Sequence, residues 1–231
     1  MSGHWCVIPA AGRGARFGGE TPKQYLEVAG KSVLVHTLEA LLLHPRIAGA
    51  MVVLPPADAS WPAGFVALHG KPVLTCTGGA SRAASVANGL AALPADVAAG
   101  DAVLVHDAAR PNLAHADLDA LFDALETCPE GAILAAPVRD TLKRADGSGR
   151  IRATEPREGL WRALTPQAFP RQSLADALAA ASKAGIEPTD EAMAMELAGR
   201  SARLVEGRED NFKITTPADL ERFAWLRERA G

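Results

Sequence analysis

Short apolar runs alternate along the chain with segments whose apolar residues recur at helical spacing. The runs are short and bounded by turn residues, which predicts strands rather than helices. Beyond the strand that opens the stretch His4–Gly19, the predicted strands span residues 50–54, 73–77, 102–106, 133–138 and 202–206. The continuous apolar runs 50–54 and 73–77 suit strands that are buried on both faces.

The predicted helices lie between these strands and carry recognisable start signals. Ser32 can cap the first, and Thr216 followed by Pro217 can open the last. The helical segments are 32–44, 81–93, 117–126, a segment around 174–181, 188–199 and one from 216 onward. The alternation predicts an α/β fold: a mostly parallel twisted sheet with helices on both faces and ligands at the carboxyl ends of the strands. We expect a single domain over residues 1–231.

One segment, 139–157, breaks the alternation. Asp146-Gly147-Ser148-Gly149 separates two short runs, which predicts a protruding β-hairpin arm rich in basic residues. An isolated two-stranded ribbon is only marginally stable, so we expect the arm to lie on another surface, that of a second subunit. A solvated loop is the alternative.

Composition excludes several classes of protein. The formal net charge of −3 offers no overall attraction for nucleic acid. Cys6, Cys76 and Cys128 are far apart and lack metal-ligand spacing, which indicates free thiols in a reducing compartment rather than a zinc site. No apolar run is long enough to span a membrane, and no signal segment opens the chain. We therefore expect a cytoplasmic protein without membrane or nucleic-acid partners.

The first strand opens into a loop with four glycines between Gly12 and Gly19. Consecutive small residues expose backbone N–H groups that can cradle a phosphate, and Arg16 and Lys23 add two cations. No lysine followed by Ser or Thr stands at P-loop spacing after Gly12 or Gly14, and Phe17 occupies the third glycine position of a dinucleotide fingerprint. The loop is therefore a third kind of phosphate-binding loop, or it is an ordinary surface loop.

Polar residues follow three other predicted strands at the same edge of the sheet. They are Gly78-Gly79 with Ser81, Arg82 and Ser85; Asp107 with Arg110; and Lys213. A single carboxylate beside a phosphate cradle suits magnesium, which takes one or two carboxylates together with substrate phosphates. Asp107 is the candidate ligand, with capping of the turn before Pro111 as its alternative role.

These motifs and several later ones resemble those of a known family along nearly the whole chain. They are Pro-Ala-Ala-Gly-x-Gly-x-Arg at 9–16, Pro-Lys-Gln-Tyr at 22–25, Gly-Gly-x-x-Arg-x-x-Ser-Val at 78–86, Val-His-Asp-Ala-Ala-Arg-Pro at 105–111, Trp-x-Ala-Leu-Thr-Pro-Gln at 161–167, Thr-Asp-Glu-Ala at 189–192 and Asn-x-Lys-Ile-Thr at 211–215. The chain resembles the 2-C-methyl-D-erythritol 4-phosphate cytidylyltransferases of the non-mevalonate isoprenoid pathway. The resemblance implies a Rossmann-like, GT-A-like nucleotidyltransferase fold.

The resemblance also implies a reaction and roles for individual residues. The phosphate of methylerythritol phosphate attacks the α-phosphorus of CTP, and pyrophosphate leaves. Catalytic cations would be Arg16, Lys23 and Lys213. Nucleotide contacts would come from Ala10, Ala11, Gly12, Gly79, Arg82, Ser85 and Asp107. Asp107 would also hold Mg²⁺. Polyol-phosphate contacts would come from Arg110, Thr141, Arg157, Thr165 and Lys213, with Thr141 and Arg157 serving the partner's site in a homodimer.

Several residues depart from this pattern or add nothing to it. Ala80 stands where the family often has Asp, which removes a polar contact near the nucleotide. We expect His106 to pack or hydrogen-bond beside the sheet rather than act as a base, and Trp161 and Trp225 to pack. Asp190 with Glu191 should be helix-start carboxylates rather than an acid/base pair. Two other functions stay open: a ribitol 5-phosphate cytidylyltransferase and a CTP-binding protein without catalysis.

Overall fold

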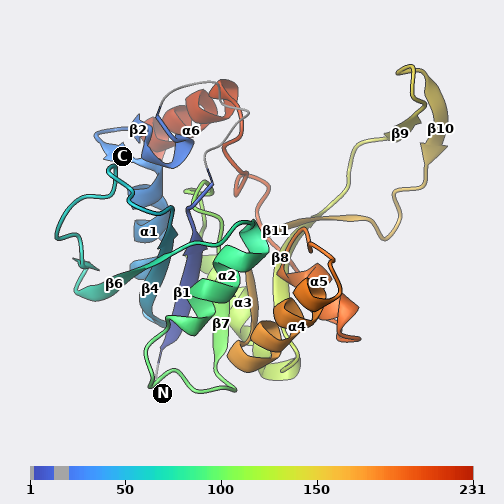
Figure 1. Ribbon diagram of the computed structural model, residues 1–231. Helices are drawn as coiled ribbons and strands as arrows, with labels where there is room; N and C mark the ends of the chain where they lie inside the picture. The colour runs from blue at the N-terminus through green and yellow to red at the C-terminus, as the bar shows by residue number, and fades with distance from the viewer. Residues whose placement is uncertain (1–2, 13–20, 231) are drawn as a thin grey trace.

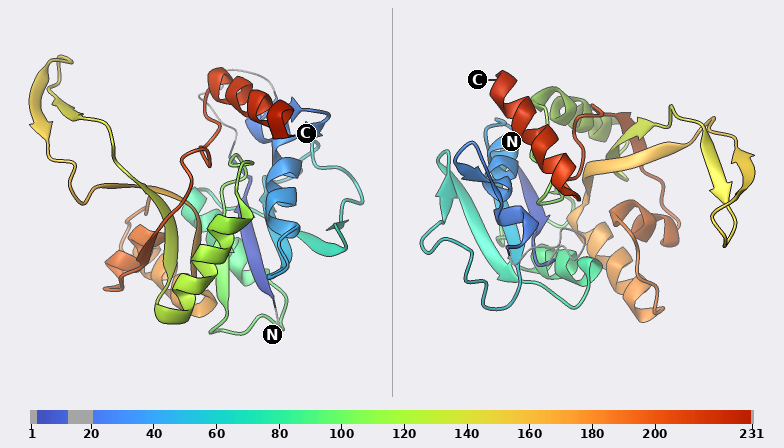
Figure 2. Two further views of the ribbon diagram at one scale, coloured as in Figure 1. Left: turned by 180° about the vertical axis from the view of Figure 1, so that it is seen from behind. Right: turned by 90° about the horizontal axis from the view of Figure 1, so that it is seen from above.

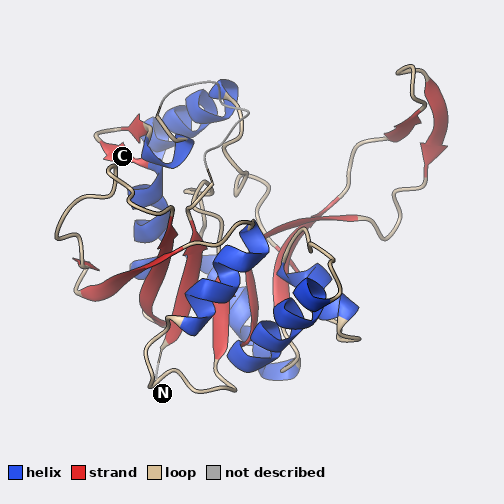
Figure 3. Ribbon diagram, viewed as in Figure 1, coloured by secondary structure: helices blue, strands red, loops and turns tan. Residues whose placement is uncertain are grey.

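A computed structural model describes residues 3–12 and 21–230 of the chain. Its main sheet, drawn in red in Figure 3, has the strand order β12-β8-β11-β7-β1-β4-β6-β5 across the described residues. In chain order these strands are β1 (His4–Pro9), β4 (Ile47–Leu54), β5 (Ala67–Leu68), β6 (Lys71–Thr77), β7 (Ala102–Val105), β8 (Ala132–Pro137), β11 (Trp161–Pro170) and β12 (Arg203–Glu206). β1 pairs in parallel with both β4 and β7, so the centre of the sheet has the predicted parallel order.

Helices cover both faces of the sheet. They are α1 (Val33–Leu42), α2 (Arg82–Ala91), α3 (His115–Thr127), α4 (Arg171–Lys183), α5 (Glu191–Leu197) and α6 (Pro217–Ala230), with a short 3-10 helix at Lys23–Tyr25. Figure 1 shows α2, α4 and α5 on the near face, and Figure 2 shows α1 and α3 on the other. Within β1, Cys6 and Ile8 join the core beneath α1 and α3, while Trp5 and Val7 join the core beneath α2, α4 and α5. This alternation of side chains is what lets one strand contribute to both layers.

Two of the predicted helix starts, at Ser32 and Ser81, are confirmed by their capping contacts. The hydroxyl of Ser32 accepts from the backbone N–H of Val35, and that of Ser81 accepts from the N–H of Ala84. These caps satisfy N–H groups that a helix start otherwise leaves without a partner. None of the described helices combines the length and the apolarity needed to cross a bilayer.

The sheet departs from the sequence prediction at β11, which was not predicted. β11 runs antiparallel to both neighbours, β7 and β8, while the sheet is mostly parallel, as predicted. The expectation that residues 73–77 are buried on both faces was also wrong, because only Val73 in β6 is buried and Leu74 is 37% exposed. Since only the two-residue β5 lies beyond it, β6 is nearly an edge strand. Trp161 and Trp225, expected to pack, are 37% and 50% exposed.

The predicted hairpin is confirmed. β9 (Leu142–Ala145) pairs antiparallel with β10 (Ile151–Glu155). The Asp146 carboxylate holds the turn by accepting from the backbone N–H groups of Ser148 and Arg150. Figures 1 and 2 show the hairpin standing well away from the sheet, and Ile151 on it is 69% exposed.

Candidate active site at the carboxyl edge of the sheet

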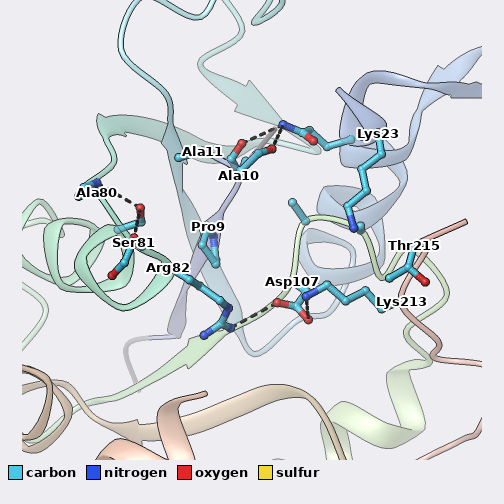
Figure 4. A pocket seen from close by; sticks show the side chains of 16 residues that line it. Pro9, Ala10, Ala11, Lys23, Ala80, Ser81, Arg82, Asp107, Lys213 and Thr215 are labelled. Atoms are coloured by element: carbon cyan, nitrogen blue, oxygen red, sulfur yellow. Dashed lines mark hydrogen bonds and ion pairs between the residues drawn. The ribbon is translucent and has the colours of Figure 1, made fainter. Parts of the chain in front are cut away.

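A cavity of about 560 Å³ lies where β1, β6 and β7 end (Figure 4). It brings together most of the residues that the sequence analysis placed in one site, as expected for the carboxyl edge of a parallel sheet. The described lining residues are Pro9, Ala10, Ala11, Gly12, Lys23, Gln24, Gly79, Ala80, Ser81, Arg82, Ser85, Asp107, Ala108, Ala109, Lys213 and Thr215. Arg16, predicted to be catalytic, lies outside the described residues.

The backbone after β1 is held by a buried amide that sequence reasoning missed. The Nε2 group of Gln24 donates to the carbonyl of Ala10 at 2.9 Å and to that of Gly12 at 3.4 Å. Gln24 is only 4% exposed, and its signal in the sequence was its place beside Lys23 in the Pro-Lys-Gln-Tyr motif. Lys23 lines the cavity and donates from Nζ to the carbonyl of Ile214 at 2.8 Å. The Gln24 contacts fasten the start of the glycine loop, and the Lys23 contact joins the neighbouring 3-10 helix to the C-terminal segment.

The loop after β6 needs glycine because it passes very close to α2. A Cβ atom at Gly79 would stand 2.5 Å from the Cβ of Ala84, closer than any real contact. The backbone N–H of Gly79 donates to the hydroxyl of Ser85 at 3.1 Å, and that hydroxyl donates to the carbonyl of Ser81. Ser85 therefore shapes the loop as well as facing the cavity.

Asp107 follows β7 and is the centre of the charge in the cavity. Its Oδ2 atom lies 3.1 Å from Arg110 Nε and 3.1 Å from Lys213 Nζ, and its Oδ1 atom lies 3.3 Å from Arg82 Nη2. Figure 4 shows Arg82 and Lys213 approaching it from either side. Burial alone would raise the pKa of Asp107, but the charges of Lys213, Arg82 and Arg110 outweigh burial and hold that pKa well below its ordinary value. The carboxylate is therefore ionised at neutral pH.

Glu191 takes part in this network, which the sequence did not indicate. The helix predicted from residue 188 begins only at Glu191, which lies at the helix start as expected, but its side chain turns inward and is 1% exposed. Both of its oxygens accept from Arg82, at 2.6 and 3.1 Å. Burial raises the pKa of Glu191, and the Arg82 guanidinium opposes that rise. The expectation that the helix dipole alone explains this carboxylate was therefore incomplete.

Thr165 contacts the backbone of Asp107, and His106 contacts Thr165 in turn. The hydroxyl of Thr165 accepts from the backbone N–H of Asp107 at 3.1 Å and lies 2.9 Å from His106 Nδ1. His106 Nε2 lies 3.0 Å from the carbonyl of Arg110, which can only accept, so Nε2 carries a proton. Burial lowers the pKa of His106 to about 4. The expectation that His106 packs rather than acts as a base agrees with these contacts.

The predicted polyol-phosphate residues are only partly brought to the cavity. Arg110 touches Asp107 and donates from Nη1 to the carbonyl of Asn211, while Thr165 is buried, so both stand behind the lining residues. Thr141 and Arg157 are exposed at the base of the arm, where Arg157 donates to the carbonyl of Arg139. The chain by itself does not bring Thr141 or Arg157 to the cavity.

The donor set at the cavity fits a divalent cation that binds through phosphate. Asp107 is the one carboxylate among the described lining residues, and it is ionised. No three His, Cys, Asp or Glu side chains gather into a metal site within ranges 3–12 and 21–230. Because Mg²⁺ commonly takes one or two carboxylates and completes its coordination with phosphates and water, Asp107 is the residue that could hold it.

Comparison with known proteins identifies the family. The family model for 2-C-methyl-D-erythritol 4-phosphate cytidylyltransferase matches residues 5–227. The enzyme of that name from Stenotrophomonas maltophilia (strain R551-3) is 64% identical over 228 residues, which are 98% of each chain. The one from Xanthomonas axonopodis pv. citri (strain 306) is 64% identical over 95% of this chain and 82% of its own.

Solved structures agree with the sequence matches. A crystal structure of 4-diphosphocytidyl-2C-methyl-D-erythritol synthase superimposes with a TM-score of 0.81 at 37% identity, covering 98% of this chain and 100% of that one. The 2-C-methyl-D-erythritol 4-phosphate cytidylyltransferase from Thermus thermophilus gives 0.79 at 34% identity, covering 99% and 100%. The resemblance and the nucleotidyltransferase fold expected from the sequence are confirmed. The chain belongs to the 2-C-methyl-D-erythritol 4-phosphate cytidylyltransferase family.

Proposed function

We propose that the cavity is where this cytidylyltransferase transfers CMP from CTP to 2-C-methyl-D-erythritol 4-phosphate, giving 4-diphosphocytidyl-2-C-methyl-D-erythritol and pyrophosphate for isoprenoid precursor synthesis. The observation that carries the proposal is the position of Asp107. It is an ionised carboxylate with three cations around it, beside two loops of small residues at the carboxyl edge of the sheet. Such a site suits a nucleoside triphosphate together with a divalent cation.

The nucleotide would be held mainly by backbone. Ala10, Ala11 and Gly12 follow β1 and Gly79 follows β6, so small residues line the cavity from two sides. Their N–H and carbonyl groups, with Ser85 and Arg82, would bind the cytidine end of CTP. We expect the base pocket that these residues form to be small and to reject purines by size.

The reaction joins two anions, so its main requirement is positive charge near the α-phosphorus. Lys23 and Lys213 both line the cavity. Arg16 would add a third cation from the glycine loop. A phosphate nucleophile is already ionised at neutral pH, so no general base is required. A neutral, fully buried His106 is consistent with that chemistry.

Asp107 would hold Mg²⁺. When bound, the ion would neutralise developing charge on the α-phosphate oxygens. Arg110, which pairs with the Asp107 carboxylate, would fix its direction, and Thr165 would hold the backbone N–H of Asp107. The family resemblance suggests that Arg110 would also contact the polyol phosphate.

We also propose a homodimer built through the arm, residues 139–157. The exposed hairpin could carry Thr141 and Arg157 to a second subunit's cavity, where they would bind the polyol phosphate. Sedimentation should then show a dimer at micromolar concentration, and a fully active monomer would contradict the shared site. Unpaired Cys6, Cys76 and Cys128 support a cytoplasmic location.

Pyrophosphate release tests the function directly. Purified protein is assayed with CTP, Mg²⁺ and either 2-C-methyl-D-erythritol 4-phosphate or ribitol 5-phosphate. We expect turnover with the first substrate and little with the second. Faster turnover of ribitol 5-phosphate would reassign the substrate, and CTP binding without pyrophosphate release from either would indicate a non-catalytic protein.

A further inference from the structure

Arg82 lies between two carboxylates that come from different parts of the fold. Its Nη1 and Nη2 atoms contact the two oxygens of Glu191 at 2.6 and 3.1 Å. The same Nη2 atom contacts Asp107 at 3.3 Å. The shorter, two-pronged contact is to Glu191, and such paired hydrogen bonds are the stronger and more directional kind. Arg82 could thus lose its contact to Asp107 and still keep its main partner.

Glu191 is fixed in place by contacts at the start of α5. The amide of Gln167, on β11, accepts from the backbone N–H of Ala192 and donates to the Asp190 carboxylate. The Asp190 carboxylate in turn caps α5 by accepting from the N–H of Met193. β11 also carries Thr165, whose hydroxyl accepts from the backbone of Asp107. One strand therefore sets the positions of both carboxylates that share Arg82.

The charges around Asp107 explain why a second carboxylate is needed. Asp107 has three cationic neighbours, Arg82, Arg110 and Lys213. Those four groups sum to +2, and adding Glu191 lowers the sum to +1. A divalent cation approaching Asp107 meets less repulsion when Arg82 is neutralised in this way.

We propose that Glu191 is a positioning residue that neutralises Arg82 and binds it more closely than Asp107 does, so that Asp107 can accept a divalent cation with CTP. The inference rests on the proposed metal site at Asp107. It makes a prediction that a merely structural role does not make. Removing the Glu191 charge should weaken metal binding, yet it should not weaken the binding of metal-free CTP, which is an anion and gains from added positive charge.

The test uses Glu191→Gln, with Glu196→Gln as the matched control. Glu196 lies on the same helix but is exposed. CTP binding is measured by calorimetry twice, in EDTA and with saturating Mn²⁺, without the polyol phosphate so that no turnover occurs. The metal coupling factor is the dissociation constant of CTP in EDTA divided by that in saturating Mn²⁺. We expect it to fall by about 10–100-fold in Glu191→Gln, with unchanged or tighter metal-free binding, and to stay at the wild-type value in Glu196→Gln.

Two results would overturn the proposal: an unchanged coupling factor in Glu191→Gln, or an equal loss of CTP affinity with and without Mn²⁺. The double variant Arg82→Gln/Glu191→Gln restores the net charge, so we expect its coupling factor to return towards wild type. A factor as low as that of Glu191→Gln would contradict the role through Arg82. Should Glu191→Gln not fold, Arg82→Gln is compared with the double variant. In Arg82→Gln the Glu191 charge is no longer neutralised by Arg82, so the coupling factor should be higher than in the double variant. A coupling factor lower than that of the double variant would refute the inference.

Asp107→Asn separates this inference from the proposed function. If Asp107→Asn keeps the wild-type coupling factor, the metal does not bind at Asp107 and the proposed site itself is wrong. If Asp107→Asn loses the coupling while Glu191→Gln keeps it, the metal site stands and only the role of Glu191 fails.

Discussion

Asp107→Asn should both destabilise the empty enzyme and abolish most of its activity. The substitution keeps the shape of the side chain but removes the negative charge that Arg82, Arg110 and Lys213 share. Taking one partner from a buried ion pair typically costs about 3–5 kcal/mol. Arg82 keeps Glu191 and Arg110 keeps the carbonyl of Asn211, so we expect the low end, about 3 kcal/mol.

For a chain of this size, that loss corresponds to a melting temperature lower by about 6–12 °C. The rate of pyrophosphate release should fall by about 10²–10³, the effect of removing one preorganised charged group. Differential scanning fluorimetry and the pyrophosphate assay measure the two effects. Asp96→Asn, at an exposed aspartate, is the matched control and should change neither.

The difference in stability between wild type and Asp107→Asn should depend on pH in a definite direction. Because the folded pKa of Asp107 is depressed, its carboxylate adds stability above the ordinary carboxyl pKa of 3.8 and loses it as the pH falls further. The gap between wild type and Asp107→Asn should stay constant from neutral pH down to about 5 and narrow in more acidic solution. A variant as stable and as active as wild type at pH 7 would refute the reasoning.

Three further predictions follow from single contacts. Gln24→Ala removes the donor to a buried carbonyl in the loop after β1, so unfolding in urea should show a loss of about 1–3 kcal/mol and the KM for CTP should rise; an unchanged KM would contradict this role. Gly79→Ala places a Cβ atom 2.5 Å from that of Ala84, so calorimetry should show weaker CTP binding, whereas Gly100→Ala, in open space, should bind normally. The buried, neutral His106 has its pKa lowered from 6.5 to about 4, so wild type should lose about 3 kcal/mol of stability between pH 7 and pH 4 that His106→Asn does not lose; parallel pH profiles would argue against it.

Local signals in the sequence were enough to predict most helices and the parallel centre of the sheet. Ser32 and Ser81 mark helix starts because their hydroxyls satisfy N–H groups within the same turn. β11 could not be predicted in this way because Thr165 and Gln167 interrupt its apolar pattern. They are polar yet buried, since their partners, Asp107 and Asp190, come from other elements.

The same distinction applies to the site. Topology alone predicted that Asp107 and the two glycine loops share an edge of the sheet, because parallel strands all end there. The pairing of Arg82 with Glu191 joins residues 109 positions apart and depends on how α5 packs, which no local pattern encodes. The roles proposed for Thr141 and Arg157 need a second subunit, so they follow from neither the sequence pattern nor the fold of one chain.

The central claim is that the cavity holds CTP with a divalent cation at Asp107. A crystal structure of the enzyme with CTP and Mn²⁺, with data collected for the anomalous signal of manganese, tests it most directly. We expect the anomalous peak beside the Asp107 carboxylate and the triphosphate between the loops that follow β1 and β6. A peak away from Asp107, or CTP bound elsewhere on the molecule, would contradict the account.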